Sequence, residues 1–148
     1  MAAKILVFSG SSREGSVNGQ LAALAARELQ ALGAEVTFIN LGKYPLPLVD
    51  ATGFGNAPKE AGELRALIDE HDGLFIASPG PMGAYRGLTQ MRTVLELGFG
   101  ATLVPEMVAV GNAASAFAEN GGLADERTAG FLKATLTRLV SMAEKLKA

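Results

Sequence analysis

The residues Ser9–Asn18 have types and spacing that are suited to binding an anion. The stretch reads Ser-Gly-Ser-Ser-Arg-Glu-Gly-Ser-Val-Asn, and it lies between an apolar run and a helical pattern. A helix that begins at this point offers free N–H groups and the positive end of its dipole, and both attract negative charge. The sequence therefore predicts a phosphate-binding loop at the start of the first helix.

The side chains of this loop add specific donors. Ser11 and Ser16 can donate hydroxyl hydrogen bonds to phosphate oxygens, and Ser16 is also a good residue to begin a helix. Arg13 can supply positive charge and paired N–H donors. Gly10 and Gly15 allow the backbone to curve around the anion.

A simpler interpretation is a strand-to-helix turn with a capping serine, since serine and glycine are common in such turns. The presence of Arg13 and Asn18 favours the phosphate site. The loop lacks the Gly-Lys-Ser/Thr ending of a nucleoside triphosphate loop, and it lacks the glycine spacing of a dinucleotide fold. These differences argue against ATP and against a Rossmann-type NAD site.

Apolar runs and helical spacings alternate along the whole chain, which predicts one α/β domain over residues 1–148. The expected strands are Lys4–Ser9, Glu35–Asn40, Gly73–Ser78 and Thr102–Val110, the last split or bent at Pro105. The expected helices are Val17–Leu32, Pro58–His71, Ala84–Leu97 and Asp125–Leu146. This alternation is typical of a doubly wound parallel sheet with helices on both faces, whose ligands bind at the carboxyl ends of the strands.

The composition excludes several functions. Without cysteine the chain has no disulfide, catalytic thiol or thiolate metal site, and one histidine is too few for the usual zinc site. That histidine, His71, is expected to cap a helix rather than to act in catalysis. The net charge is −2 and the chain has no cluster of basic residues, which makes nucleic acid an unlikely partner. The apolar runs are too short to span a membrane. We expect a cytoplasmic protein.

The loop pattern Gly-Ser-x-Arg-x-x-Ser-x-Asn after the first strand resembles that of the NADPH-dependent FMN reductase family. Further segments resemble the family in the same order along the chain. These segments are Leu41, Tyr44–Leu48, Ser78–Gly83, Arg92, Val94–Leu95, Val104–Pro105, Val110–Ala113, Phe117, Asn120–Gly121 and Asp125–Glu126.

The resemblance implies a flavodoxin-like fold and a flavin-dependent reductase. NADPH or NADH would donate hydride to bound FMN, and a small-molecule acceptor such as a flavin or quinone would take the electrons. The flavin performs this chemistry, so no catalytic side chain is required. The residues of this loop that are expected to bind the cofactor are Gly10, Ser11, Arg13, Ser16, Val17 and Asn18, with Ser11, Arg13, Ser16 and Asn18 at the phosphate.

The chain departs from the family after its third strand. The Pro-Glu-Tyr-Asn loop that contacts the flavin ring, and the strand-helix unit after it, have no counterpart here, and Gly73–Ala77 leads directly into Ser78–Gly83. An alternative alignment places Gly83, Tyr85, Gly87 and Leu88 at the end of the missing loop. The expected sheet therefore has four strands, shortened from five, in the order 2-1-3-4. The residues expected to flank the ring are Pro79, Gly80, Pro81, Met82, Gly83 and Tyr85.

Loss of that unit would expose apolar faces on helices 58–71 and 84–97, so we expect a homo-oligomer that buries them. The alternative function is a non-enzymatic module, a shortened relative that binds flavin or phosphate, or only oligomerises.

Overall fold

Three parallel strands form the sheet of this computed structural model, which describes residues 1–47, 57–78, 85–112 and 115–147. The strands are β1 (Lys4–Ser9), β2 (Glu35–Asn40) and β3 (Gly73–Ala77), in the order β2-β1-β3. In the register, Ile5 of β1 lies opposite Val36 of β2 and Gly73 of β3. Ile5, Leu6 and Val7 of β1 are fully buried, because the central strand is covered on both faces.

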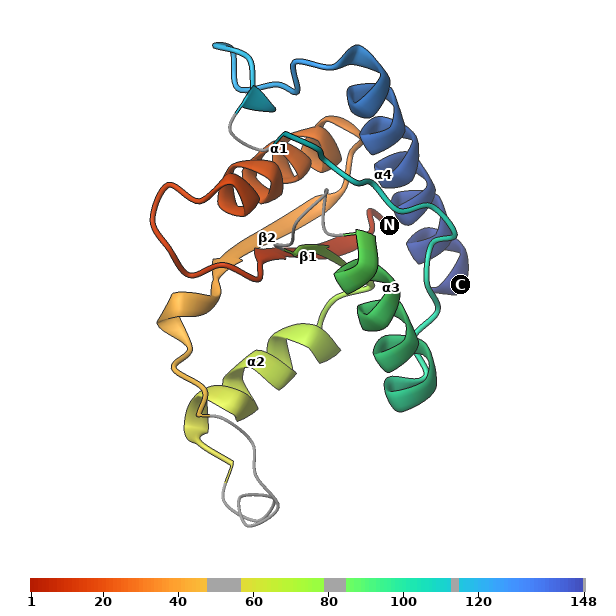
Figure 1. The fold of residues 1–148 in the computed structure, drawn as a ribbon. Helices are drawn as coiled ribbons and strands as arrows, with labels where there is room; N and C mark the ends of the chain where they lie inside the picture. Colours follow the sequence, from red (N-terminus) through yellow and green to blue (C-terminus); the bar gives the residue numbers. More distant parts are fainter. Residues whose placement is uncertain (48–56, 79–84, 113–114, 148) are drawn as a thin grey trace.

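The described residues form four α-helices, α1 (Val17–Ala31), α2 (Lys59–Asp69), α3 (Tyr85–Thr93) and α4 (Glu126–Leu146). A 3₁₀ turn at Leu41–Lys43 follows β2, and a π-helical turn at Val94–Gly98 continues α3. Figure 1 shows α1 above the sheet, next to α4, and α2 and α3 on the opposite side. The expected alternation of elements and the helices on both faces are confirmed.

Local sequence explains where the long helices begin and end. The side chains of Ser16 and Asp125 cap α1 and α4 by accepting hydrogen bonds from the N–H groups of Gly19 and Thr128. Helix α1 ends before Gly33, which has a φ of 88°, a conformation that glycine adopts without strain.

The prediction of a fourth strand over Thr102–Val110 is wrong. Among the residues that the structure describes, this segment pairs with no strand, and the sheet has three strands instead of four. Pro105 lacks the N–H group that a ladder requires, and the Val104 carbonyl accepts a hydrogen bond from Arg92 Nη1 at 2.7 Å. Glu106 pairs with Arg138 of α4, and the segment runs past α4 toward α1 (Figure 1).

The two layers of helices are packed unequally. The core consists mainly of residues from β1, α1 and α4, such as Val7, Leu29 and Leu136. By contrast, α2 and the described part of α3 contain no fully buried residue. The layer of α2 and α3 is therefore the looser side of the molecule. Within the described ranges, no helix is both long enough and apolar enough to cross a bilayer.

Candidate functional site

The loop between β1 and α1 is shaped by its own hydrogen bonds. Ser9 Oγ accepts from the Ser11 N–H at 3.0 Å and donates to the Ser11 carbonyl at 3.3 Å. The Gly10 N–H donates to the Ala77 carbonyl at 2.8 Å, which attaches the loop to the end of β3. The loop therefore lies at the carboxyl ends of two neighbouring strands, where ligands of parallel sheets bind.

The start of α1 presents unused donors. Ser16 is 3% exposed, and its Oγ accepts from the Gly19 N–H at 3.0 Å. Its hydroxyl hydrogen is still able to donate to a ligand. The N–H groups of Val17 and Asn18 belong to the first turn of the helix, and no described residue accepts from them. Gly15 makes the approach possible, since its φ of 66° is disfavoured for other residues.

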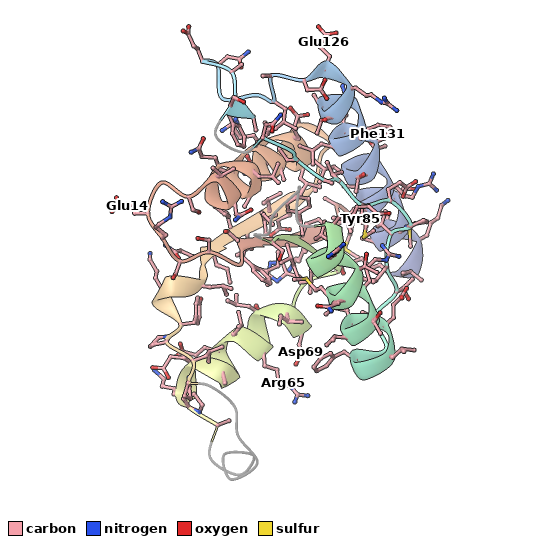
Figure 2. All side chains as sticks on the ribbon, viewed as in Figure 1. Glu14, Arg65, Asp69, Tyr85, Glu126 and Phe131 are labelled. Carbon is pink, nitrogen blue, oxygen red and sulfur yellow. The ribbon has the colours of Figure 1, made fainter. Side chains whose placement is uncertain are left out.

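The charges around this helix start favour an anion. Arg13 forms no ion pair among the described residues, and the first turn of α1 contains no acidic residue. Glu14, whose carboxylate would repel phosphate, is exposed and points outward from the loop (Figure 2). The donor set fits a phosphate group, which accepts hydrogen bonds from N–H, hydroxyl and guanidinium groups.

A cavity of about 840 Å³ extends from this loop along β3. Five of the six residues predicted to bind the cofactor at this loop line it: Ser11, Arg13, Ser16, Val17 and Asn18. Gly10 does not line the cavity, and its N–H group donates to the Ala77 carbonyl. The structure thus brings together the predicted loop side chains at one end of a single cavity.

The rest of the cavity wall is mainly apolar. Helix α3 contributes Leu88 and Met91, and the π-helical turn after it contributes Leu95. Helix α4 contributes Leu139, Met142 and Leu146, and the segment Leu103–Val110 forms a further wall. Leu146, the last residue of α4, lines this open space and is 67% exposed.

The residues predicted for the flavin ring are placed only in part. Pro79, Gly80, Pro81, Met82 and Gly83 lie outside the described residues. Tyr85 is the first residue of α3, is 58% exposed, and is not among the cavity-lining residues. Figure 2 shows it at the first turn of this helix. Ring contacts by these residues stay predictions.

An acidic residue at the other end of the cavity was not identified from the sequence. Asp72 Oδ2 accepts from the Lys4 N–H at 2.7 Å and from Lys147 Nζ at 2.9 Å. The hydrogen bond from the Lys4 backbone, followed by that from Lys147, lowers the pKa of the Asp72 carboxyl below its ordinary value. No sequence signal links Asp72 to Lys147, because the two are distant in the chain and meet only in the fold.

His71 has the structural role expected of it. Its Nδ1 lies 2.5 Å from the Leu67 carbonyl near the end of α2, and its Nε2 lies 2.7 Å from Thr37 Oγ1 of β2. A neutral ring that donates through Nδ1 and accepts through Nε2 satisfies both contacts. In the described part of the chain, no group of three or more His, Asp or Glu side chains is arranged to hold a metal ion.

A parallel sheet in the order β2-β1-β3 with helices on both faces is typical of a flavodoxin-like fold, in which ligands bind at the carboxyl ends of the strands. The chain belongs to the NADPH-dependent FMN reductase family, whose sequence pattern matches residues 3–88. The family makes it a flavin-dependent NAD(P)H oxidoreductase with FMN as cofactor and NAD(P)H as electron donor. The matched residues include the whole phosphate loop.

The fold is shared with a solved flavoenzyme, the NAD(P)H:(acceptor) oxidoreductase FerB from Paracoccus denitrificans. The TM-score is 0.68 at 22% sequence identity, and the match covers 97% of this chain and 98% of FerB. At this identity the likeness establishes the fold alone. A comparison with curated protein sequences finds no match.

Proposed function

We propose that this chain binds FMN with its phosphate at the start of α1 and reduces small-molecule acceptors such as quinones or free flavin. The observation that supports the site is the placement of Ser11, Arg13 and Ser16 at one end of the cavity, beside the first N–H groups of α1. When bound, FMN would supply the redox chemistry between NAD(P)H and the acceptor.

The chain's own residues bind and orient the cofactor. Arg13 and the helix dipole would neutralise the phosphate, and the Ser16 hydroxyl and the N–H groups of Val17 and Asn18 would donate hydrogen bonds to it. Pro79–Gly83 and Tyr85 are proposed to flank the ring. This arrangement requires no acid or base among the side chains.

Titration with FMN tests the proposal. We expect saturable binding with one FMN per chain, seen as quenching of flavin fluorescence, and a higher Tm with FMN present. Oxidation of NADPH or NADH in the presence of a quinone should then require FMN. Binding without any reduction of the acceptor would favour the flavin-binding module, and absence of both would contradict the proposed site.

We also propose a cytoplasmic homo-oligomer built from one flavodoxin-like domain. Reduced nicotinamide is an intracellular electron donor, and a chain without cysteine is compatible with that compartment. The oligomer is supported by an apolar patch at the end of α3, formed by Val94, Leu97 and Phe99, which are 56%, 84% and 77% exposed. Large apolar side chains gathered on one surface are typical of protein interfaces.

A further inference from the structure

We propose that a second copy of this chain pairs its Glu106–Val110 segment with the open edge of β3, so that two copies share one continuous sheet. Strand β3 pairs with β1 through one edge, and its other edge pairs with no described strand. The inference rests on the proposed homo-oligomer, and it does not depend on FMN.

The open edge of β3 carries main-chain groups that need partners. The Ala77 carbonyl accepts from the Gly10 N–H, so the main-chain groups of Ala77 face β1. Alternate residues of a strand direct these groups to opposite edges, which places those of Leu74 and Ile76 on the cavity side. No described main-chain group outside the sheet bonds to them. Unpaired polar groups beside apolar walls cost free energy, so this edge favours another strand.

The segment Glu106–Val110 has the complementary property. None of its main-chain N–H or carbonyl groups forms a main-chain hydrogen bond with a described residue, although most of the segment is only partly exposed. Its five residues match the length of β3, and they follow Pro105, so every one of them has an N–H group. The β-branched Val108 and Val110 favour an extended strand.

The fold keeps this segment away from β3 of the same chain. Arg92 Nη1 of α3 donates to the Val104 carbonyl at 2.7 Å, and Arg138 Nε of α4 pairs with Glu106 Oε1 at 2.6 Å. These contacts hold the segment in the wall of the cavity of about 840 Å³ that β3 also lines. The missing partner of each is therefore available from a second copy, without breaking either contact.

The exchange between two copies is reciprocal. Each Glu106–Val110 segment stays in the wall of its own cavity and enters the cavity of the other copy. The order across the dimer is β3, the second copy's segment, the first copy's segment, and the second copy's β3. A twofold axis generates this order, because both copies use the same surface. Both segments then have partners on both edges.

FMN and the inserted strand use different parts of the cavity. The phosphate loop Ser11–Asn18 lies at the carboxyl end of β3, and ligands of parallel sheets bind in the crevice outside these ends. The inserted strand lies beside β3 itself, and the cavity continues past β3 to Asp72 and Leu146. A strand in this part leaves the loop open to the phosphate.

The accessible surface of the chain is large enough for this dimer. The chain exposes 9670 Å², whereas a monomer of this mass is expected to expose about 7,100 Å². A standard interface buries about 800 Å² on each partner, which is well within the difference. The exposed patch of Val94, Leu97 and Phe99 shortly precedes the segment in the chain, so one interface can include both.

Cross-linking between copies tests the pairing directly, because the chain has no cysteine of its own. A Leu74→Cys chain is mixed with a Val108→Cys chain and treated with a bismaleimide that reaches about 8 Å, less than two strand spacings. We expect a cross-linked dimer. The controls are Leu74→Cys alone, whose two β3 strands lie three spacings or about 14 Å apart, and Leu74→Cys mixed with Phe131→Cys on the exposed face of α4. Neither control should cross-link.

A proline variant tests whether main-chain pairing holds the copies together. Val108→Pro removes a donor that no described main-chain acceptor uses, so the chain should fold and become monomeric by light scattering. Val108→Ala keeps the donor and should stay oligomeric. Amide exchange at Leu74 and Ile76 of the wild type should slow by at least about tenfold as the protein concentration rises through the dissociation constant. If the proline variant does not fold, the cross-linking and exchange measurements still decide.

The proposal is overturned by a wild type that is monomeric at all concentrations, or by equal cross-linking in the controls. Protection of Leu74 and Ile76 that does not depend on concentration would show that the chain covers its own edge. Loss of the cross-link on addition of FMN would show that cofactor and strand compete for the cavity. A failure to bind FMN while the cross-link forms contradicts only the proposed cofactor site.

Discussion

At the scale of single residues, Arg13 and Ser16 have different roles in the same loop. Arg13 is exposed and unpaired within the described part of the chain, so its guanidinium is available to a ligand. Ser16 is buried, and its oxygen already caps α1. Substitution of Arg13 should therefore affect ligand affinity alone, whereas substitution of Ser16 should affect both affinity and stability.

We expect Arg13→Ala to weaken FMN binding by about tenfold or more, because a charge-assisted hydrogen bond to the phosphate is lost. The Tm of the protein without FMN should be unchanged within about 1 °C, as for most exposed substitutions. Fluorescence titration and thermal melting measure the two effects. Arg86→Ala is the matched control, because Arg86 is exposed on α3 and does not line the cavity. Equal affinities of the Arg13 and Arg86 variants would show that Arg13 does not contact the phosphate.

Ser16→Ala should lower the free energy of unfolding by about 1 kcal/mol, because the first turn of α1 loses its cap. This change corresponds to a fall in Tm of about 2–4 °C, measured without FMN. FMN affinity should fall as well, because the hydroxyl donor is removed. Ser12→Ala is the control, since Ser12 is exposed and its side chain forms no hydrogen bond with the described residues. A stable Ser16→Ala protein would mean that another group caps the helix.

At the scale of elements, Asp72 connects three parts of the chain that are far apart in sequence. Its carboxylate follows α2 and precedes β3, and it accepts from the first residue of β1 and from Lys147 at the end of α4. The side chain of Asp72 is 19% exposed, so solvent screens these contacts only in part. The pair therefore holds the end of α4 against the amino-terminal edge of the sheet.

We expect Asp72→Asn to lower the Tm at pH 7, because the ion pair with Lys147 is lost. The pKa of Asp72 is lower in the folded protein than its ordinary value, so the charged carboxylate stabilises the fold. This contribution is complete above the ordinary pKa and disappears as the pH falls through the lower pKa of the folded state. The Tm difference between wild type and variant should accordingly vanish in strong acid.

Asp69→Asn is the control for this experiment, since its contact with Arg65 is a 3.4 Å pair between exposed side chains of α2 (Figure 2). Such pairs contribute little to stability. A Tm difference for Asp72→Asn that is the same at pH 7 and in strong acid would show that its charge does not stabilise the fold.

At the scale of the whole molecule, the apolar patch of Val94, Leu97 and Phe99 predicts how copies associate. We expect the double substitution Leu97→Glu and Phe99→Glu to convert the oligomer to monomers, because it places charges in the apolar interface. Light scattering measures the molar mass. Phe131→Glu is the control, because Phe131 is 55% exposed on α4, outside this patch (Figure 2). A monomeric wild type, or an oligomer unaffected by the double substitution, would contradict the prediction.

The sequence by itself predicted the first three strands, the four helices and the family. Helix α1 begins after its cap Ser16 and ends before Gly33 for local reasons, and the burial of Ile5–Val7 follows from a continuous apolar run. The order of the first three strands follows from the same alternation of elements. These features depend on residues that are near one another in the chain, so they can be predicted from the sequence alone.

Only the tertiary structure decided what happens beside β3. Thr102–Val110 has the composition of a strand, but a strand requires a partner at about 4.8 Å, and the segment is instead held by Arg92 and Arg138. The contact of Asp72 with Lys147 and the cavity along β3 likewise depend on segments distant in sequence. Sequence patterns record which residues prefer burial or extension, whereas non-local pairing depends on which segments reach one another in space.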